Sequence, residues 1–348
     1  MFTRKFQVLF IFLVVGALIF ASCTPTEEPV VEEPVEEVEE PEEVVEEVEE
    51  PIDVSLRLAW IINAQAAGPF VALEKGYFAD EGLNVTINAG GPDANSITLV
   101  AAGSDTYGLH DTNSLVQAEA EGVSLVTVAT FWEKHPGCVI TTTDAGITEL
   151  SDFAGKRLGF KEGGPWTLTK AMLRKNGVDP ASMEQISIGF GVAPILEDQV
   201  DMMTGFCTNE NLAVAREGKE VITFLPSDYG VETSTEALFT SRSFHADNPG
   251  VSCKMVRAIQ KGWEYALANK EEAIDIVIKY GGEELDFDLQ LQQLIAQEDF
   301  IVTAESEEFG IGHMSPERWQ NAHDVLLAEG ELAEAVDISE VFDMSCWE

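Results

Sequence analysis

The chain has 348 residues, of which 45% are hydrophobic and 24% charged, and its formal net charge is −42. That apolar fraction is ordinary for a packed protein of about two domains, which excludes global disorder. With 20 Lys and Arg against 62 Asp and Glu, the chain repels phosphate backbones, so no nucleic-acid partner is expected.

Residues 1–22 predict an export signal. Two basic residues precede the 13-residue apolar run VLFIFLVVGALIF, which is too short for a bilayer-spanning helix of about 20 residues. The small pair Ala-Ser before Cys23 resembles a bacterial lipoprotein cleavage box, although Phe20 stands where Leu is usual. By this resemblance Cys23 is the lipid-modified first residue of the mature chain. The alternative is an ordinary secretory signal with an incidental cysteine.

The segment 23–51 is a predicted stalk. Between residues 24 and 51 it contains fourteen Glu, several Pro and no basic residue, so it cannot bury enough apolar surface to fold and should stay extended. A solubilising tail without a spacing role is the alternative. Removing this segment and the two N-terminal bases from the total leaves −30 on residues 52–348, so the body is itself acidic.

From residue 53 onward, hydrophobic periodicity predicts alternating strands and helices. In the first part the expected strands are 53–60, 85–87, 106–110 and 123–132, with helices around Phe70–Tyr77, after Asn95 and over 113–121. This alternation predicts a largely parallel, doubly wound sheet.

A second strand-rich run follows a break at residues 134–137. The expected strands are 138–143, 157–161, 186–188, 202–207 and 220–225, with a helix over 165–175. The last third is predicted to be helical, over 251–269, 271–280, 287–300 and 316–327.

This order of elements predicts an α/β protein of two lobes linked by a hinge. We expect the chain to cross between the lobes near residues 134–140 and again near 235–241. Lobe one then comprises 52–135 and 239–348, lobe two comprises 136–238, and the C-terminal helices pack on lobe one. Ligands favour clefts between lobes and the carboxyl ends of parallel strands.

Four cysteines remain after Cys23. Outside the cytoplasm they could pair in three ways, and buried free thiols are equally compatible with the sequence. They are Cys138, Cys207, Cys253 and Cys346. No CxxC or paired Cys/His spacing is present, so no structural zinc site is expected.

The candidate ligand-binding residues follow predicted strands or open predicted helices. They are Trp60, Asn63, Gln65, Asp111, Thr112, Trp132, Gly163, Gly164, Trp166, Asn209 and Glu210. Trp166, directly after Gly-Gly-Pro, is the strongest candidate for stacking on a ligand. Trp60 and Trp132 could equally be core residues, Asp111 and Asn209 could only cap helices, and the two glycines could only serve a tight turn.

The stretch LRLAWIINAQAAGPFVALEKGYFADEGLNVTI carries a family resemblance. With its GYF-x-x-EGL-x-V segment at 76–85, it is similar to the opening of NMT1/THI5-like solute-binding proteins, which bind thiamine precursors, riboflavin or sulfonates. Further matches are the glycine pair 90–91, GKRLG at 155–159, TNE at 208–210 and DYG at 228–230. The resemblance covers roughly residues 54–345.

The resemblance implies a periplasmic-binding-protein (Venus flytrap) fold and delivery of a solute to an ABC importer. The expected partners are a small molecule, a permease and, through the lipid anchor alone, the outer face of the bacterial cell membrane, with the protein acting as a monomer. Aromatic, amide and carboxylate side chains suit a flat heterocycle such as riboflavin or a thiamine pyrimidine precursor. A sulfonate or other small anion is the alternative, and it would favour Arg, Lys or a helix N-terminus.

Enzymatic function is not expected, and neither is a cofactor. The eukaryotic pyrimidine synthase of the same family needs a cysteine-rich iron-binding motif, and no CCxxC-like cluster occurs here. The five histidines show no HExxH or HxH spacing, and no GxSxG or GxxxxGK[ST] motif is present. Such a synthase therefore ranks last among the alternatives.

Overall fold

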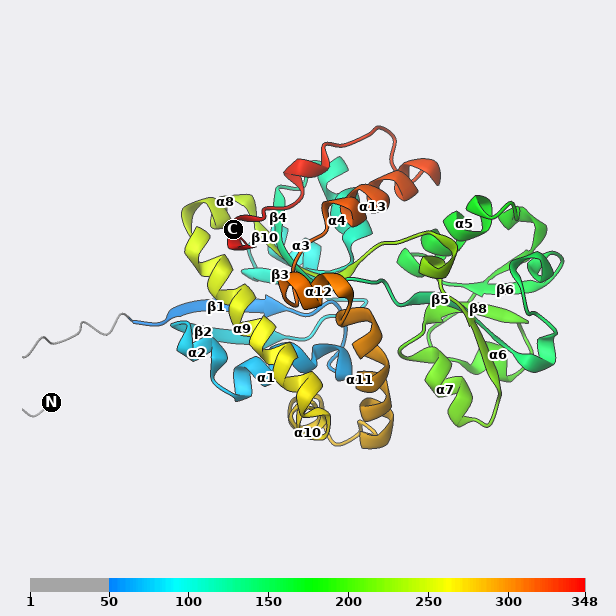
Figure 1. The fold of residues 1–348 in the computed structure, drawn as a ribbon, viewed down its shortest axis with the longest axis horizontal. Helices are drawn as coiled ribbons and strands as arrows, with labels where there is room; N and C mark the ends of the chain where they lie inside the picture. Colours follow the sequence, from blue (N-terminus) through cyan, green and yellow to red (C-terminus); the bar gives the residue numbers. More distant parts are fainter. Residues whose placement is uncertain (1–49, 348) are drawn as a thin grey trace, which may run out of the picture. The chain divides into compact units, whose positions relative to one another are not determined.

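Two five-stranded sheets form the framework of the computed structural model, which describes residues 50–347 (Figure 1). The predicted export signal, Cys23 and nearly all of the acidic segment lie outside the described residues. The first sheet has the order β2-β1-β3-β10-β4, and the second has the order β7-β6-β8-β5-β9. The first contains β1 (Ile52–Arg57), β2 (Leu83–Asn88), β3 (Tyr107–His110), β4 (Leu125–Trp132) and β10 (Thr235–Ser241). The second contains β5 (Gly137–Thr142), β6 (Arg157–Phe160), β7 (Glu184–Ser187), β8 (Met202–Phe206) and β9 (Val221–Phe224).

Each sheet with its helices is one lobe, so the predicted two-lobed α/β fold is present. The first lobe carries α1 (Ala67–Glu74), α2 (Tyr77–Asp80), α3 (Ser96–Ala101), α4 (Thr112–Ala120), α8 (Arg242–Asp247), α9 (Pro249–Ala268), α10 (Lys270–Gly281), α11 (Phe287–Ile301), α12 (Ala304–Phe309) and α13 (Pro316–Ala328). The second lobe carries α5 (Gly164–Lys175), α6 (Ala193–Leu196) and α7 (Glu210–Arg216).

Each sheet is largely parallel, as predicted, with one antiparallel strand, β10 in the first sheet and β5 in the second. β1 pairs with β2 and β3 in parallel, but β10 is antiparallel to β3 and β4. The sequence predicts a crossing between the lobes over residues 235–241, with a lobe boundary at residue 238, but in the structure these residues form β10. Because β10 lies between two neighbouring strands of the first sheet, the second crossing takes place before Thr235.

The C-terminal helices pack on the first lobe, with α9 lying across α1 (Figure 1). The two helices approach closely because each presents glycine at the contact. A Cβ atom on Gly262 would lie 2.1 Å from the carbonyl oxygen of Gly68, and one on Gly68 would lie 2.5 Å from the ring of Trp263. Neither contact is sterically possible, so both positions require glycine at this spacing.

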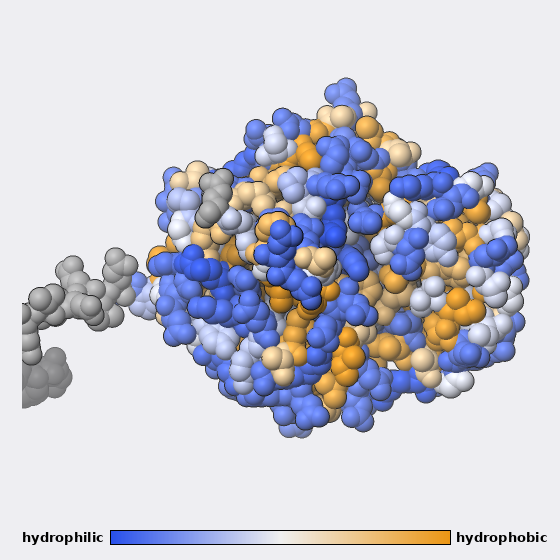
Figure 2. Space-filling model, in the orientation of Figure 1, coloured by the Kyte–Doolittle hydropathy of each residue, from blue (hydrophilic) through white to orange (hydrophobic). Residues whose placement is uncertain are grey.

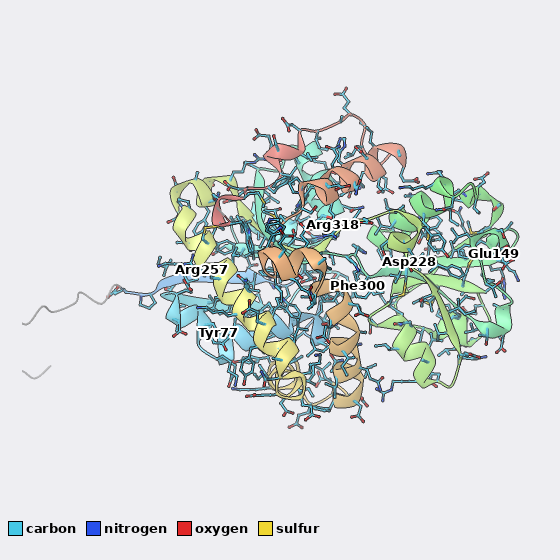
Figure 3. All side chains as sticks on the ribbon, in the orientation of Figure 1. Tyr77, Glu149, Asp228, Arg257, Phe300 and Arg318 are labelled. Atoms are coloured by element: carbon cyan, nitrogen blue, oxygen red, sulfur yellow. A yellow bond between two sulfur atoms is a disulfide. The ribbon has the colours of Figure 1, made fainter. Side chains whose placement is uncertain are left out.

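The two connections between the lobes run side by side. The amide of His135 donates to the carbonyl of Thr233 at 2.9 Å, and Ser234 Oγ donates to the carbonyl of Glu133 at 3.1 Å. Helices of the first lobe hold the first connection, since the amide of Lys134 donates to the carbonyl of Phe300 and Arg318 bonds the buried Glu133 carboxylate at 3.1 Å (Figure 3). These short, paired segments are the hinge.

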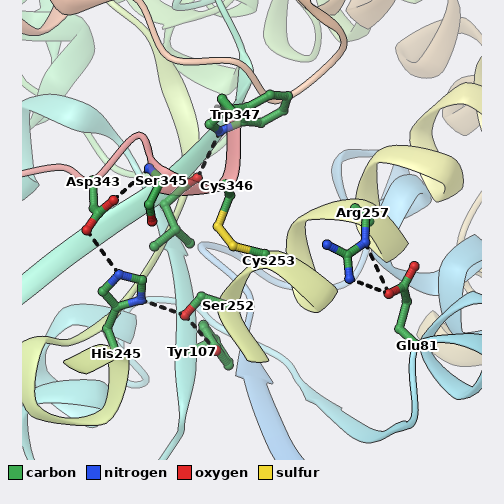
Figure 4. The surroundings of a disulfide bond; sticks show 11 residues. Glu81, Tyr107, His245, Ser252, Cys253, Arg257, Asp343, Ser345, Cys346 and Trp347 are labelled. Atoms are coloured by element: carbon green, nitrogen blue, oxygen red, sulfur yellow. Dashed lines mark hydrogen bonds and ion pairs between the residues drawn. A yellow bond between two sulfur atoms is a disulfide. The ribbon is translucent and has the colours of Figure 1, made fainter. Parts of the chain in front are cut away.

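Two disulfides join the four cysteines of the body. Cys138–Cys207 links β5 to the residue directly after its neighbour β8, and Cys253–Cys346 fixes the C-terminal segment to α9 (Figure 4). Of the possibilities that the sequence left open, the structure therefore has one specific pairing and no free thiol at these four positions.

Beside the second disulfide lies a Ser–His–Asp sequence of hydrogen bonds (Figure 4). His245 contacts Ser252 Oγ at 2.9 Å and Asp343 at 3.2 Å, and Ser252 also contacts the Tyr107 hydroxyl. Ser252 and Tyr107 are both fully buried. Because no substrate carbonyl can reach Ser252, this network anchors the C-terminal segment and is not a nucleophilic centre.

The outer surface is mainly hydrophilic on the face seen in Figure 2, with separate apolar patches between polar side chains. This agrees with the acidic composition of the body. Within residues 50–347, no helix is both long enough and apolar enough to span a bilayer.

Replacing both Cys253 and Cys346 by Ser should lower the unfolding free energy by about 2–4 kcal/mol, because the bond closes a long loop in the unfolded chain. The two residues are 93 positions apart. Denaturant unfolding without reductant measures the effect, and the Cys138/Cys207 pair, 69 positions apart, serves as a matched comparison. Identical unfolding midpoints for wild type and the Cys253/Cys346 variant would contradict the prediction.

Candidate ligand-binding site

A cavity of about 640 Å³ lies between the lobes and is lined by residues of both. The first lobe contributes the loops after β1 and β3 and the start of β10, and the second contributes the loops after β6, β7 and β8. A volume of this size is typical of sites for small organic molecules. The cavity therefore forms where the sequence predicted an inter-lobe cleft.

Eight of the predicted site residues line this cavity. They are Trp60, Asn63, Gln65, Asp111, Gly163, Gly164, Asn209 and Glu210. They meet because β1, β3, β6 and β8 all direct their carboxyl ends toward the gap between the sheets. Their roles in ligand binding remain predictions.

Three predicted residues do not line the cavity, which corrects the prediction for each. Trp166 is 5% exposed and packs in the core of the second lobe beside Phe160, although it was the strongest stacking candidate. Trp132 is 1% exposed and meets Trp263 edge to face. Thr112 is buried and donates from Oγ1 to the carbonyl of Ser234, so it supports the hinge.

Asp111 and Asn209 are both possible helix caps, but only Asp111 caps a helix. Asp111 does cap α4, since its Oδ1 accepts from the amide of Ser114 at 2.9 Å. Asn209 precedes α7 without capping it, and its Oδ1 accepts instead from Gln293 on α11 at 2.6 Å. Asn209 thus connects the two lobes.

An aromatic pair, with one ring from each lobe, lines the cavity. Trp60 of the first lobe and Phe190 of the second have ring centroids 5.3 Å apart, with their planes inclined at 45°. Phe190 was missed by the sequence analysis, yet it is 68% exposed and lies between two glycines after β7. An exposed aromatic residue in such a loop is the signal that could have identified it.

One cation enters the cavity, and it is already paired. Lys161 Nζ bonds Glu210 Oε1 at 3.1 Å and lies 5.2 Å from the centre of the Phe190 ring. The other Glu210 oxygen accepts from the amide of Phe206 at 2.9 Å. Of the described residues lining the cavity, Lys161 is the sole Lys or Arg, so the one cationic side chain that an anionic ligand could use already has Glu210 as its partner.

His135 lies at the cavity floor in the first hinge segment and is held by glycines. The amide of Gly137 donates to its Nδ1 at 2.9 Å. A Cβ atom on Gly164 would lie 3.2 Å from its Nε2, which gives Gly164 a steric reason to be glycine. Burial lowers the pKa of His135 to about 4, although the negative charge of Asp111 opposes this shift. The imidazole is therefore neutral near pH 7.

Two acids near this floor have opposite protonation preferences. Burial is the largest single effect on Asp111 and would raise its pKa, but the hydrogen bond to His110 at 2.8 Å, the neighbouring imidazoles and the amide of Ser114 together outweigh it, and the pKa lies below its usual range. Burial raises the pKa of Glu236 to about 7, with Gln65 opposing the shift and the charge of Asp111 adding to it. Asp111 is therefore ionised, and Glu236 is largely protonated below neutral pH. The sequence analysis missed Glu236 because β10 itself was not predicted.

Polar and ionic contacts join the lobes on two sides of the cavity. Arg216 of α7 makes a two-pronged ion pair with Asp286, at 2.9 and 3.1 Å, just before α11. On α5, Lys170 pairs with Glu331 at 2.8 Å and Arg174 pairs with Glu329. The described structure is thus a closed arrangement of the lobes.

A metal centre is not indicated. Among residues 50–347 there is no group of three or more His, Cys, Asp or Glu side chains placed to hold a metal ion.

The sequence is similar to those of known solute-binding proteins. Residues 63–273 match the model of the family described as "NMT1/THI5 like", and the chain belongs to that family. It is 28% identical over 298 residues to the riboflavin-binding protein RibY of Chloroflexus aurantiacus, covering 83% of this chain and 84% of that one. It is 27% identical to the formylaminopyrimidine-binding protein of Halalkalibacterium halodurans, covering 83% and 89%.

A solved structure confirms the fold class. The periplasmic aliphatic sulphonate binding protein SsuA from Escherichia coli superposes with a TM-score of 0.65 at 15% identity, covering 83% of this chain and 97% of that one. The fold is therefore that of the periplasmic binding proteins, and the relatives together support a solute-binding protein.

Replacing Glu236 by Gln should change how stability depends on pH. The pKa of Glu236 in the folded protein, about 7, exceeds the ordinary value of 4.5. The protonated carboxyl group therefore contributes to the unfolding free energy of the wild type, relative to E236Q, in full below about pH 4.5, and this contribution is lost as pH rises through 7. The loss should total roughly 3 kcal/mol. Denaturant unfolding at several pH values measures it. The exposed Glu308→Gln variant should give a flat difference, and an equally flat difference for E236Q would contradict the prediction.

Proposed function

We propose that this protein is an extracytoplasmic solute-binding lipoprotein of an ABC importer, and that it captures a flat aromatic heterocycle between its lobes. Riboflavin is the first candidate and a thiamine pyrimidine precursor the second. The observation that carries the proposal is the Trp60–Phe190 pair, in which one ring from each lobe lines a cavity whose one Lys or Arg side chain is already paired with Glu210.

The aromatic pair supports a stacking mode of binding. Trp60 and Phe190 come from different lobes, so a planar ring between them would contact both at once. Their separation of 5.3 Å is too short for an inserted ring, so the side chains must move apart by rotamer change or slight opening of the lobes. Closure onto the ring would then link ligand binding to lobe position.

The cavity's size favours riboflavin over a single pyrimidine. A volume of about 640 Å³ exceeds what one six-membered ring with small substituents fills. The amides Asn63, Asn95 and Gln297 in its wall can bond ring edges or the hydroxyl groups of a ribityl chain. The riboflavin-binding and formylaminopyrimidine-binding relatives are the reason for testing these two ligands first.

A sulfonate is the alternative ligand for the same kind of importer. The paired state of Lys161 and the ionised Asp111 both disfavour an anion. A family-type pyrimidine synthase is disfavoured because the sequence lacks the cysteine-rich iron-binding motif of those enzymes.

The transport role also rests on the N-terminal segment. Residues 1–22 would be removed as a signal peptide, the lipid on Cys23 would hold the protein at the outer face of the cell membrane, and the acidic segment to residue 51 would act as the stalk. The folded body, which acts as a monomer, would then present its closed form to a permease.

The first test is the identity of any bound small molecule. The protein, purified gently, should be yellow and should release a flavin on denaturation, or the empty protein should bind riboflavin with quenching of the flavin fluorescence. Thermal shifts with riboflavin, formylaminopyrimidine and an alkanesulfonate compare the three ligands, because a bound ligand raises the melting temperature. A shift with the alkanesulfonate alone would contradict the proposal.

Phe190→Ala should weaken riboflavin binding by about 1–3 kcal/mol through loss of stacking, without destabilising the fold. Phe190 is largely exposed, so little core packing is lost. Fluorescence titration measures the affinity. The control is Phe309→Ala, which removes another exposed ring, on α12, that does not line the cavity. Equal affinities for the two variants would remove Phe190 from the site.

A further inference from the structure

Glu236 occupies an unusual position at the start of β10. Its backbone has a φ of 52°, in the left-handed region that favours glycine, and its side chain is buried while lining the cavity. A long acidic side chain in this conformation at a cavity wall is a combination that tends to persist at functional sites.

One of the two carboxyl oxygens is already used. Gln65 Nε2 donates to Glu236 Oε1 at 2.5 Å, and Gln65 is positioned by the helical turn Ala64–Ala66, which Asn63 caps. Among residues 50–347, no protein group bonds the second oxygen, Oε2. The surrounding protein atoms do not enclose this oxygen completely. It therefore has access to the cavity.

Burial favours the neutral form of Glu236, and the charge of Asp111 adds to this effect, although Gln65 and His110 oppose it. From β3 and the start of α4, His110 and the ionised Asp111 face it, and the His135 ring lies in the adjacent hinge segment. The turn that carries Gln65 presents no charged group. Across the cavity, the second lobe presents Lys161, Glu162 and Glu210, of which the first and last are paired with each other.

We propose that Glu236 is a specificity-determining residue, which binds the ligand as a protonated carboxyl group and donates a hydrogen bond from Oε2 to a carbonyl oxygen or an unprotonated ring nitrogen. This inference rests on the proposed function, since it concerns the same cavity. It defines the ligand class more narrowly as a neutral heterocycle with an in-plane acceptor.

The same arrangement explains what the site rejects. A ligand with only N–H donors at this edge would favour the ionised form of Glu236, and the negative charge of Asp111 opposes that form. An anionic group would meet the charge of Asp111. A carbonyl edge such as that of a flavin pyrimidine ring is uncharged and accepts a hydrogen bond, so it neither ionises Glu236 nor is repelled by Asp111.

The experiment measures the affinity of the full-length protein for riboflavin between about pH 5.5 and about pH 8.5, a range in which riboflavin keeps one protonation state. The wild-type affinity should fall above neutral pH, approaching about tenfold per pH unit. Glu236→Gln keeps a neutral donor, so it should bind with a flat profile, and Glu308→Gln should follow the wild type. A flat wild-type profile, or an unchanged slope in E236Q, would overturn the inference.

A second measurement separates this inference from the ligand assignment. If the wild type binds no riboflavin at any pH, the ligand assignment fails, and the protonation of Glu236 is then decided on the ligand-free protein. The infrared difference spectrum between wild type and E236Q below neutral pH should contain the carbonyl stretch of a protonated carboxyl group. Absence of that band would overturn the inference independently of any ligand.

Discussion

The pairing of the two inter-lobe connections is the constraint on which the site depends. The amide of His135 bonds the carbonyl of Thr233, so the chain leaves the first sheet and returns to it at the same place. The outgoing segment brings His135 to the cavity floor, and the returning one leads directly into β10 and Glu236. The hinge and the polar floor of the cavity are thus built from the same few residues. Any ligand that contacts this floor contacts the hinge as well.

The sequence predicted most of the fold because most of its elements carry strong local patterns. Helices α9, α10, α11 and α13 were expected within a few residues of their observed limits. The clearest signal is the apolar face of α9, which carries Val256, Ile259, Trp263 and Ala266. Strand β10 lacked such a pattern. It is buried along nearly its whole length between β3 and β4, and its partners are far away in the sequence. Only the returning chain path makes it a strand, and no local property encodes that path.

The sequence predicts cavity-lining residues that directly follow the carboxyl ends of strands. It does not predict those whose position depends on how helices and lobes pack. Asn63, Asp111 and Glu210 follow from the rule that ligands gather at the carboxyl ends of strands. Trp166 failed because an aromatic residue in the first turn of a helix can face either the cavity or the sheet, and here it packs in the second lobe's core. Phe190 instead lines the cavity from the second lobe, on a loop whose position relative to the first lobe depends on how the lobes meet.

The ion pairs across the cleft have a consequence of their own. They unite opposite charges of two strongly acidic lobes, at Arg216–Asp286 on one side and at Lys170–Glu331 and Arg174–Glu329 on the other. Each pair has at least one partly exposed partner and contributes little alone, and mobile ions screen the exposed charges together. The spacing between the lobes therefore responds to the ionic strength of the surroundings. Retention of an uncharged solute would then weaken in concentrated salt, although neither the solute nor the rings that hold it carry a charge.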